Sequence, residues 1–244
     1  MVHHERKGSG TGGMARIVLD ARSHQAIRQA GAEAEAYGLP PENAGRWRGK
    51  RLTGLIGAMQ ALGHDIDIAI PTSDNLAGAA ALVVASRSQA LMFSAAEVDD
   101  ITAFVVGGGG LLLMANHRLF VAPQQQIVRA LGLPLRIEDL SITGSPEVRL
   151  RPHVLTEGCD AVAIRNGSII IPAPSADVLA TFAADERLAF AVASDRSEAR
   201  RGRVVVTSDS GFLASLDDKQ RPLFETAGNA RFVRNIIEWL TAGE

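Results

Sequence analysis

The stretch FSAAEVDDITAFVVGGGGLLLMANH, residues 93–117, is the most informative part of the chain because it contains a helix, a turn and a strand in succession. Ser94 is a favoured helix N-cap, and Glu97 three residues later completes a capping box. The apolar residues that follow recur at helical spacing, and the glycines at 107–110 allow the helix to end and the chain to reverse.

A short strand is predicted directly after these glycines. Residues 111–114 are apolar without interruption, which is typical of a parallel strand that is covered on both faces. Open α/β sheets place their ligands at the carboxyl ends of such strands. In this chain that position holds Asn116 and His117 rather than a nucleophile.

The rest of the amino half repeats the same alternation of strands and helices. Strands are predicted at residues 16–19, 66–70, 81–85 and 111–114, and helices at 50–62 and 123–131. Short loops between such elements predict an α/β fold with a doubly wound, mostly parallel sheet.

The carboxyl half has a different pattern, with short alternating strands that predict a small antiparallel extension. These strands are predicted at residues 147–150, 161–164, 168–171 and 188–193, with Asn166-Gly167 as a hairpin turn. Residues 202–207 return to the buried type of strand, and Asn229 is expected to cap a final amphipathic helix.

Composition limits the classes of function. The chain has 244 residues, 46% of them hydrophobic, and a formal net charge of −2, so attraction to nucleic acid is not expected. A single cysteine excludes an internal disulfide and a cysteine-rich zinc site. No apolar run reaches the roughly 18 residues that span a bilayer, and we expect no membrane insertion and a cytoplasmic location. Residues 1–14 are expected to form a flexible leader, and residues 15–244 a single domain.

Polar residues follow several of the predicted strands. Because parallel strands share one carboxyl edge, we expect these residues to line a common pocket for an unknown small molecule or a protein partner. The predicted ligand-binding residues are Asp20, His24, Arg87, Asn116, His117, Asp209 and Ser210.

Other interpretations of the same residues stay open. Asp20, His24, His117 and Asp209 could hold a divalent metal, or a histidine could act as a general base. Ser210, His117 and Asp20 have the composition of a catalytic triad, but the G-x-S-x-G motif is missing. Asp20 could equally stabilise a turn, and a loop histidine is often a simple hydrogen-bonded surface residue.

Six segments of the chain together form a recognisable pattern. They are Asp20 to His24, the strand 81–85, residues 93–113, His153 to Gly158, 202–213 and 229–240. This pattern resembles the class I glutamine amidotransferase-like superfamily, and more narrowly its non-amidotransferase branch. That branch includes bacterial domains of unknown function, a gliding-motility ABC-transporter auxiliary component and an intraflagellar-transport subunit. The resemblance covers roughly residues 15–241 and implies a flavodoxin-like doubly wound fold.

One departure from this superfamily bears on activity. Glutamine amidotransferases carry a cysteine on a sharp turn after a central strand and a His-x-Glu motif downstream. The comparable turn here reads Met114-Ala115-Asn116-His117, and no His-x-Glu follows the late strand. Because glutamine hydrolysis needs an activated nucleophile, we expect no glutaminase activity. In the leading interpretation the site holds no catalytic residue, no metal and no cofactor.

The leading hypothesis is therefore a non-catalytic ligand-binding or protein-interaction domain of this superfamily. The alternative is a hydrolase-type enzyme, metal-assisted or not, that uses the Asp, His and Asn residues at the strand ends. A homodimer is compatible with both hypotheses.

Overall fold

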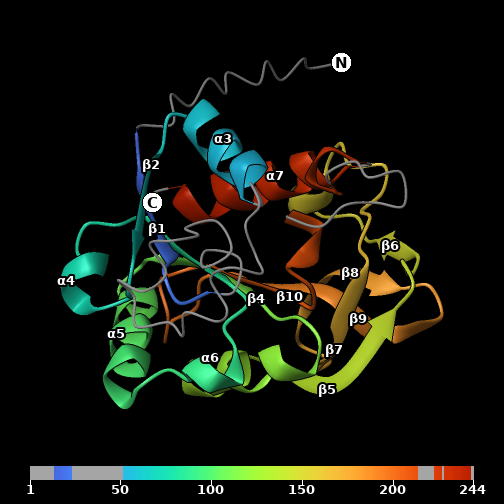
Figure 1. Cartoon of the computed structure of the whole chain (residues 1–244), viewed down its shortest axis with the longest axis horizontal. Coiled ribbons are helices and arrows are strands. Elements are labelled where there is room, and N and C mark those ends of the chain that lie inside the picture. Colours follow the sequence, from blue (N-terminus) through green and yellow to red (C-terminus); the bar gives the residue numbers. More distant parts are fainter. Residues whose placement is uncertain (1–13, 24–51, 214–222, 227, 243–244) are drawn as a thin grey trace, which may run out of the picture.

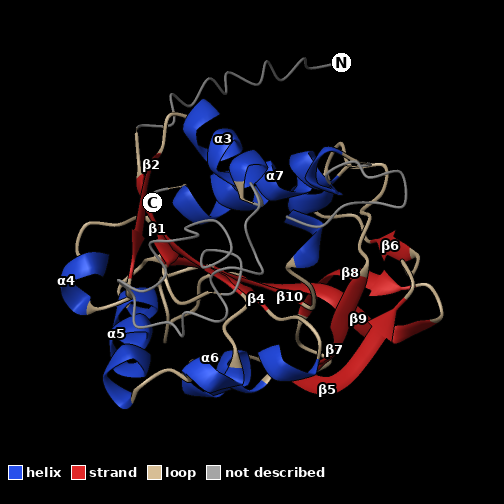
Figure 2. Cartoon of the chain, viewed as in Figure 1, coloured by secondary structure: helices blue, strands red, loops and turns tan. Residues whose placement is uncertain are grey.

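In the computed structural model the chain folds into a single sheet with helices on both faces (Figures 1 and 2). The structure describes residues 14–23, 52–213, 223–226 and 228–242. The strands follow the order β2-β1-β3-β4-β10-β9-β7-β5, with β8 paired to β9 and β6 paired to β8. The predicted α/β fold is confirmed. The predicted leader and His24 lie outside the described residues, apart from Met14.

Five neighbouring strands of this sheet are parallel. They are β2 (Asp65–Ala69), β1 (Arg16–Asp20), β3 (Ala81–Ala85), β4 (Gly110–Met114) and β10 (Val204–Thr207). Every residue of β3, β4 and β10 is buried, as their uninterrupted apolar sequences predicted.

Two layers of helices cover the parallel strands (Figure 1). The helices α3 (Thr53–Ala61) and α7 (Asn229–Thr241) pack in the hydrophobic core on one face, and α5 (Ala95–Val106) and α6 (Ala122–Ala130) pack on the other with the short α4 (Ser73–Leu76). Gly110 lets α7 approach β4 closely, because a Cβ there would lie 2.5 Å from the carbonyl oxygen of Leu240. No helix among the described residues combines the length and apolar character needed to cross a membrane.

The antiparallel part continues the sheet beyond β10. It consists of β9 (Asp185–Ser194), β7 (Asn166–Pro172), β5 (Leu135–Thr143), β8 (Asp177–Phe182) and β6 (Val148–Leu150). The sequence predicted an extension here but missed β5 and β8. Short 3-10 helices connect the strands: η2 (Gln89–Leu91), η3 (Arg118–Phe120), η4 (Val154–Thr156), η5 (Gly211–Leu213) and η6 (Leu223–Glu225).

The predicted hairpin turn at Asn166-Gly167 is wrong, because both residues belong to β7 and pair with Thr143 and Ile142 of β5. The glycine serves a close approach of main chains instead of a turn. A Cβ on Gly167 would lie 3.1 Å from the carbonyl oxygen of Ser208.

The predicted strand at 161–164 and the predicted cap at Asn229 are both wrong, for one shared reason. Asn229 is the first residue of α7 after the N-cap Gly228, and its side chain makes no cap bond. Its Oδ1 accepts from Ala163 N at 2.9 Å, and its Nδ2 donates to Ala163 O at 2.8 Å. The amide side chain thus satisfies the main-chain N–H and carbonyl of Ala163, and it is not free to cap α7.

The capping box that the sequence predicted is confirmed. Ser94 is the N-cap of α5, its hydroxyl accepts from Glu97 N, and the Glu97 carboxylate accepts from Ser94 N. This local motif places Glu97 at the start of α5, next to the residues that follow β3.

Candidate functional site

The carboxyl ends of four neighbouring parallel strands bring predicted site residues together. Because β1, β3, β4 and β10 run in the same direction and are adjacent, whatever follows them lies along one edge of the sheet. The structure places on this edge Asp20 at the end of β1, Arg87 after β3, Asn116 and His117 after β4, and Asp209 and Ser210 after β10.

Three buried side chains form a chain of hydrogen bonds across this edge. Asn116 Nδ2 donates to Ser210 Oγ at 3.2 Å, and Ser210 Oγ lies 2.5 Å from Ser86 Oγ. Ser86 Oγ also donates to the carbonyl oxygen of Ala115 at 2.8 Å. Since a carbonyl only accepts and each hydroxyl has one proton, the Ser86 proton serves Ala115 and the Ser210 proton serves Ser86. Both hydroxyl groups therefore hold the ends of β3, β4 and β10 together. We call Ser86, Asn116 and Ser210 the strand-end relay.

The strand-end relay also determines the protonation of His117. The main-chain N–H of His117 donates to Asn116 Oδ1 at 2.8 Å, which identifies that atom as the amide oxygen. His117 Nδ1 lies 2.7 Å from the same oxygen, so Nδ1 carries a proton and Nε2 of the neutral ring is an acceptor. Partial burial lowers the pKa of His117 and favours this neutral form. His117 is an exposed residue, and it therefore offers Nε2 from a rigidly supported position.

A buried ion pair lies beside the strand-end relay. Arg87 is 0% exposed, and its Nη2 donates to Glu97 Oε1 at 2.8 Å. The guanidinium carbon lies 4.1 Å from the centre of the Phe93 ring, a cation–π contact. Burial alone would raise the pKa of Glu97, but the N–H of Ser94 and the Arg87 guanidinium outweigh it and lower that pKa. Glu97 consequently stays ionised at neutral pH and balances the Arg87 charge.

Asp20 stabilises the turn that follows β1. Its carboxylate accepts from Arg22 N at 3.1 Å and from Ser23 Oγ at 3.0 Å, while Ser23 Oγ accepts from Ala85 N at 2.9 Å. These contacts join the ends of β1 and β3. Burial raises the pKa of Asp20, although the positive charge of Arg87 opposes the rise.

Asp209 is a buried carboxyl group at the other end of the edge. It is 1% exposed, and its Oδ1 accepts from Gly211 N at 2.6 Å, which shapes the turn into η5. Burial raises the pKa of Asp209 to about 7, although main-chain N–H groups, among them that of Gly211, oppose the rise. Asp209 thus changes charge near neutral pH.

The predicted site left out Ser86 and Ser23, although both follow predicted strands, and it left out the second role of Glu97. Ser86 directly follows the predicted strand 81–85, so the strand-end argument applied to it as it did to Arg87. Its backbone is left-handed, with a φ of 65°, which is uncommon for a residue with a side chain. Glu97 was recognised only as a capping residue, because nothing in the local sequence shows that Arg87 lies against it.

The metal interpretation included His24, which lies outside the described residues, so it stays a prediction. Within the described ranges, no three His, Cys, Asp or Glu side chains gather closely enough to hold a metal ion. The ring nitrogen of His117 that makes a hydrogen bond contacts Asn116, and the Ser210 hydroxyl contacts Ser86 and Asn116. Burial raises the pKa of the Cys159 thiol, which disfavours the reactive thiolate.

Comparisons with known proteins show the fold. No family model and no curated protein matches the chain. The mmIFT52 N-terminal domain superposes with a TM-score of 0.67 at 11% identity, over 94% of this chain and 99% of that one. Cytoplasmic Protein STM1381 from Salmonella typhimurium LT2 has a TM-score of 0.62 at 17% identity, over 80% and 89%. A thua-like protein from Bacteroides uniformis ATCC 8492 has a TM-score of 0.51 at 12% identity, over 98% and 95%. At such identities the likeness concerns architecture alone.

Proposed function

We propose that the chain is a non-catalytic ligand-binding or protein-interaction domain of the class I glutamine amidotransferase-like superfamily. The parallel strands support a flavodoxin-like membership, because their order β2-β1-β3-β4-β10 corresponds to the 2-1-3-4-5 order of that doubly wound arrangement. The likeness to the mmIFT52 N-terminal domain along 94% of the chain supports treating residues 15–244 as one domain. A cytoplasmic location is part of the same proposal.

The observation that carries the proposal is the inward bonding of the strand-end relay. An enzyme of the hydrolase type needs a nucleophile whose proton passes to a base. Here the Ser86 hydroxyl donates to the carbonyl oxygen of Ala115, and the Ser210 hydroxyl contacts Ser86 Oγ and the Asn116 amide nitrogen, neither of which is a general base. These bonds join the ends of three strands, which supports a scaffold role for both hydroxyl groups.

The strand-end relay would serve binding by supporting His117. A neutral imidazole whose Nδ1 proton is held by Asn116 presents Nε2 as a fixed acceptor, which suits a ligand or partner with a hydroxyl or N–H donor. Asp20, Arg87 and Asp209 would contribute from beneath, because all three are buried and set the shape and charge of the edge. His24 belongs to the proposed site by its position in the sequence, two residues beyond Arg22.

The test compares the wild-type chain with His117→Ala in a thermal-shift screen of amino acids, sugars and nucleotides. Without added compound, both proteins should unfold within about 1.5 kcal/mol of each other, because the variant loses one hydrogen bond of an exposed side chain to Asn116. A compound that stabilises the wild type should lose most of its effect on the variant. Glutamine should release no ammonia above background with either the wild type or Cys159→Ala.

Two outcomes would remove His117 from the site. A loss of more than about 2 kcal/mol in the variant without any compound would show a structural role instead. Equal stabilisation of both proteins by every active compound would show that binding occurs elsewhere. Ammonia release that Cys159→Ala abolishes would contradict the non-catalytic proposal itself.

A further inference from the structure

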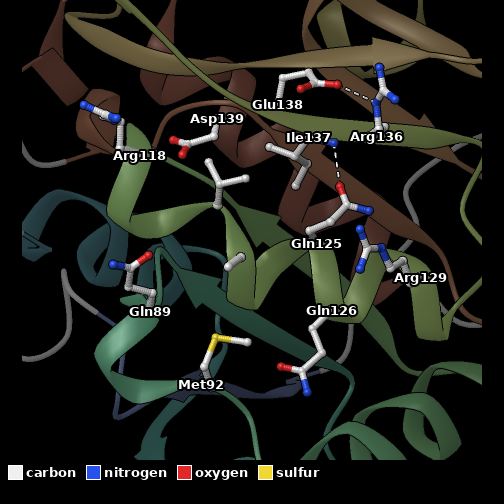
Figure 3. Close-up of a pocket in the computed structure, with 12 residues that line it drawn as sticks. Gln89, Met92, Arg118, Gln125, Gln126, Arg129, Arg136, Ile137, Glu138 and Asp139 are labelled. Carbon is white, nitrogen blue, oxygen red and sulfur yellow. Dashed lines mark hydrogen bonds and ion pairs between the residues drawn. The ribbon is translucent and has the colours of Figure 1, made fainter.

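A groove outside the strand-end edge runs between β5 and the helices on that face of the sheet (Figure 3). Its volume is about 760 Å³, and its walls come from η2, η3, α6 and β5. None of the predicted site residues lines it. The groove is therefore separate from the strand-end relay.

One wall of this groove is the edge of a strand rather than its face. Four consecutive residues of β5, 136–139, line the groove, although side chains of consecutive strand residues point to opposite faces. A groove that meets all four must run along the backbone edge. β5 is the last strand in the hydrogen-bonded order, so only its β7 edge is paired within the described part of the chain.

One outward-pointing main-chain N–H on this edge of β5 is already hydrogen-bonded to a side chain. Ile137 N donates to Gln125 Oε1 of α6 at 2.7 Å, so this N–H points toward the groove and away from β7. Farther along, the register between β5 and β7 shifts between Glu138 and Ile142, and Leu140 within this irregular segment is 59% exposed. Exposed edges of this kind can accept an additional strand.

The charge of the groove indicates what kind of strand would fit. Arg118 of η3 and Arg129 of α6 lie toward opposite ends of the groove (Figure 3), and both are exposed. Arg136 pairs with Glu138 at 2.5 Å, and Asp139 also lines the groove on the side of Arg118 (Figure 3). The lining thus has three arginines against two carboxylates, and neither Arg118 nor Arg129 makes an ion pair among the described residues. Met92, which is 43% exposed, adds apolar surface between the two cations, whereas Ile137 is buried in the core.

We propose that this groove binds an extended acidic segment of a partner protein, which adds as a strand to the free edge of β5. Main-chain carbonyls of the segment would replace Gln125 at Ile137 N, its acidic side chains would meet Arg118 and Arg129, and its apolar side chains would contact Met92. This proposal rests on the protein-interaction alternative of the proposed function, and it specifies the kind of partner.

The test uses a fluorescein-labelled peptide of alternating Glu and Val as the probe, with binding to the wild-type chain measured by fluorescence anisotropy at low ionic strength. Arg118→Glu combined with Arg129→Glu should raise Kd about tenfold or more, because both variants reverse exposed charges that face the probe. Arg234→Glu, an exposed arginine of α7 on the opposite face of the sheet, should leave Kd unchanged. Binding should weaken as salt is added.

Two control peptides separate strand addition from simple charge attraction. A peptide with Lys in place of Glu should not bind, and the Glu-Val peptide with two adjacent prolines at its centre should lose binding because proline has no N–H and resists strand pairing. Equal binding of the proline peptide, or no binding of the Glu-Val peptide, would overturn the proposal. A dimer of the free chain in sedimentation that the double variant dissociates would assign the groove to a second copy and overturn it too. These failures leave the His117 comparison unaffected, so the two proposals fail separately.

Discussion

Replacement of Glu97 by alanine is expected to destabilise the chain by about 3–5 kcal/mol, the range found when one partner of a buried ion pair is removed. Arg87 is 0% exposed, and among the described residues its guanidinium forms an ion pair with Glu97 alone, at 2.8 Å. The variant leaves that charge buried without a counterion and also removes half of the capping box of α5. Chemical denaturation at neutral pH measures the difference.

Two further variants show whether the ion pair causes this loss. Asp99→Ala changes an exposed acidic residue of the same helix and should stay within about 0.5 kcal/mol of the wild type. Arg87→Leu combined with Glu97→Leu should recover much of the stability that Glu97→Ala loses, because no uncompensated charge remains. If Glu97→Ala proves no more destabilising than Asp99→Ala, the buried pair does not hold this edge of the sheet.

Asp209→Asn is expected to change how stability depends on pH. The pKa of Asp209 is about 7 in the folded chain, against about 3.9 for an aspartate in the unfolded chain. Between these values the folded state holds a proton that the unfolded state has lost, so stability falls as pH rises from about 4 to about 7. This difference corresponds to roughly 4 kcal/mol, and stability is fully retained only below the lower value.

The asparagine variant stays neutral across this range and keeps a side-chain oxygen for Gly211 N. Its stability relative to the wild type should therefore improve by several kcal/mol as pH rises from about 4 to about 7.5. Comparison of the two proteins is essential, since the raised pKa of Asp20 gives the wild type a dependence of the same sign. Denaturation curves whose midpoints shift in parallel across the pH series would show that Asp209 does not titrate there.

The parallel half of the fold could be predicted because a strand that is buried on both faces has an uninterrupted apolar sequence. Residues 81–85 and 111–114 read as uninterrupted apolar runs, and the structure has β3 and β4 there. The capping box is likewise a local pattern. The antiparallel half was harder to predict from the sequence, since β5 is an edge strand of mixed polarity with an irregular register. The pairing of Asn229 with Ala163 joins residues 66 positions apart, and no local pattern reveals it.

The position of the site could be predicted in outline from topology, because residues that follow parallel strands must meet at one edge. The contacts between the side chains of the site could not be predicted from the sequence. Ser86 and Ser210 are 124 residues apart in sequence, and only packing of the sheet brings their hydroxyl groups together. The same holds for the complete burial of Arg87, which the sequence presents as an ordinary loop arginine.

The central claim is that the strand-end polar groups bond inward to one another and leave His117 as the outward group. Nitrogen-15 NMR of the His117 ring tests this most directly, since it reports which ring nitrogen is protonated. At neutral pH we expect a proton on Nδ1, none on Nε2 and a pKa below the usual histidine range, with the preference for Nδ1 lost in Asn116→Leu. A neutral ring protonated on Nε2 in the wild type would contradict the claim, because Nδ1 would then have no proton to share with Asn116.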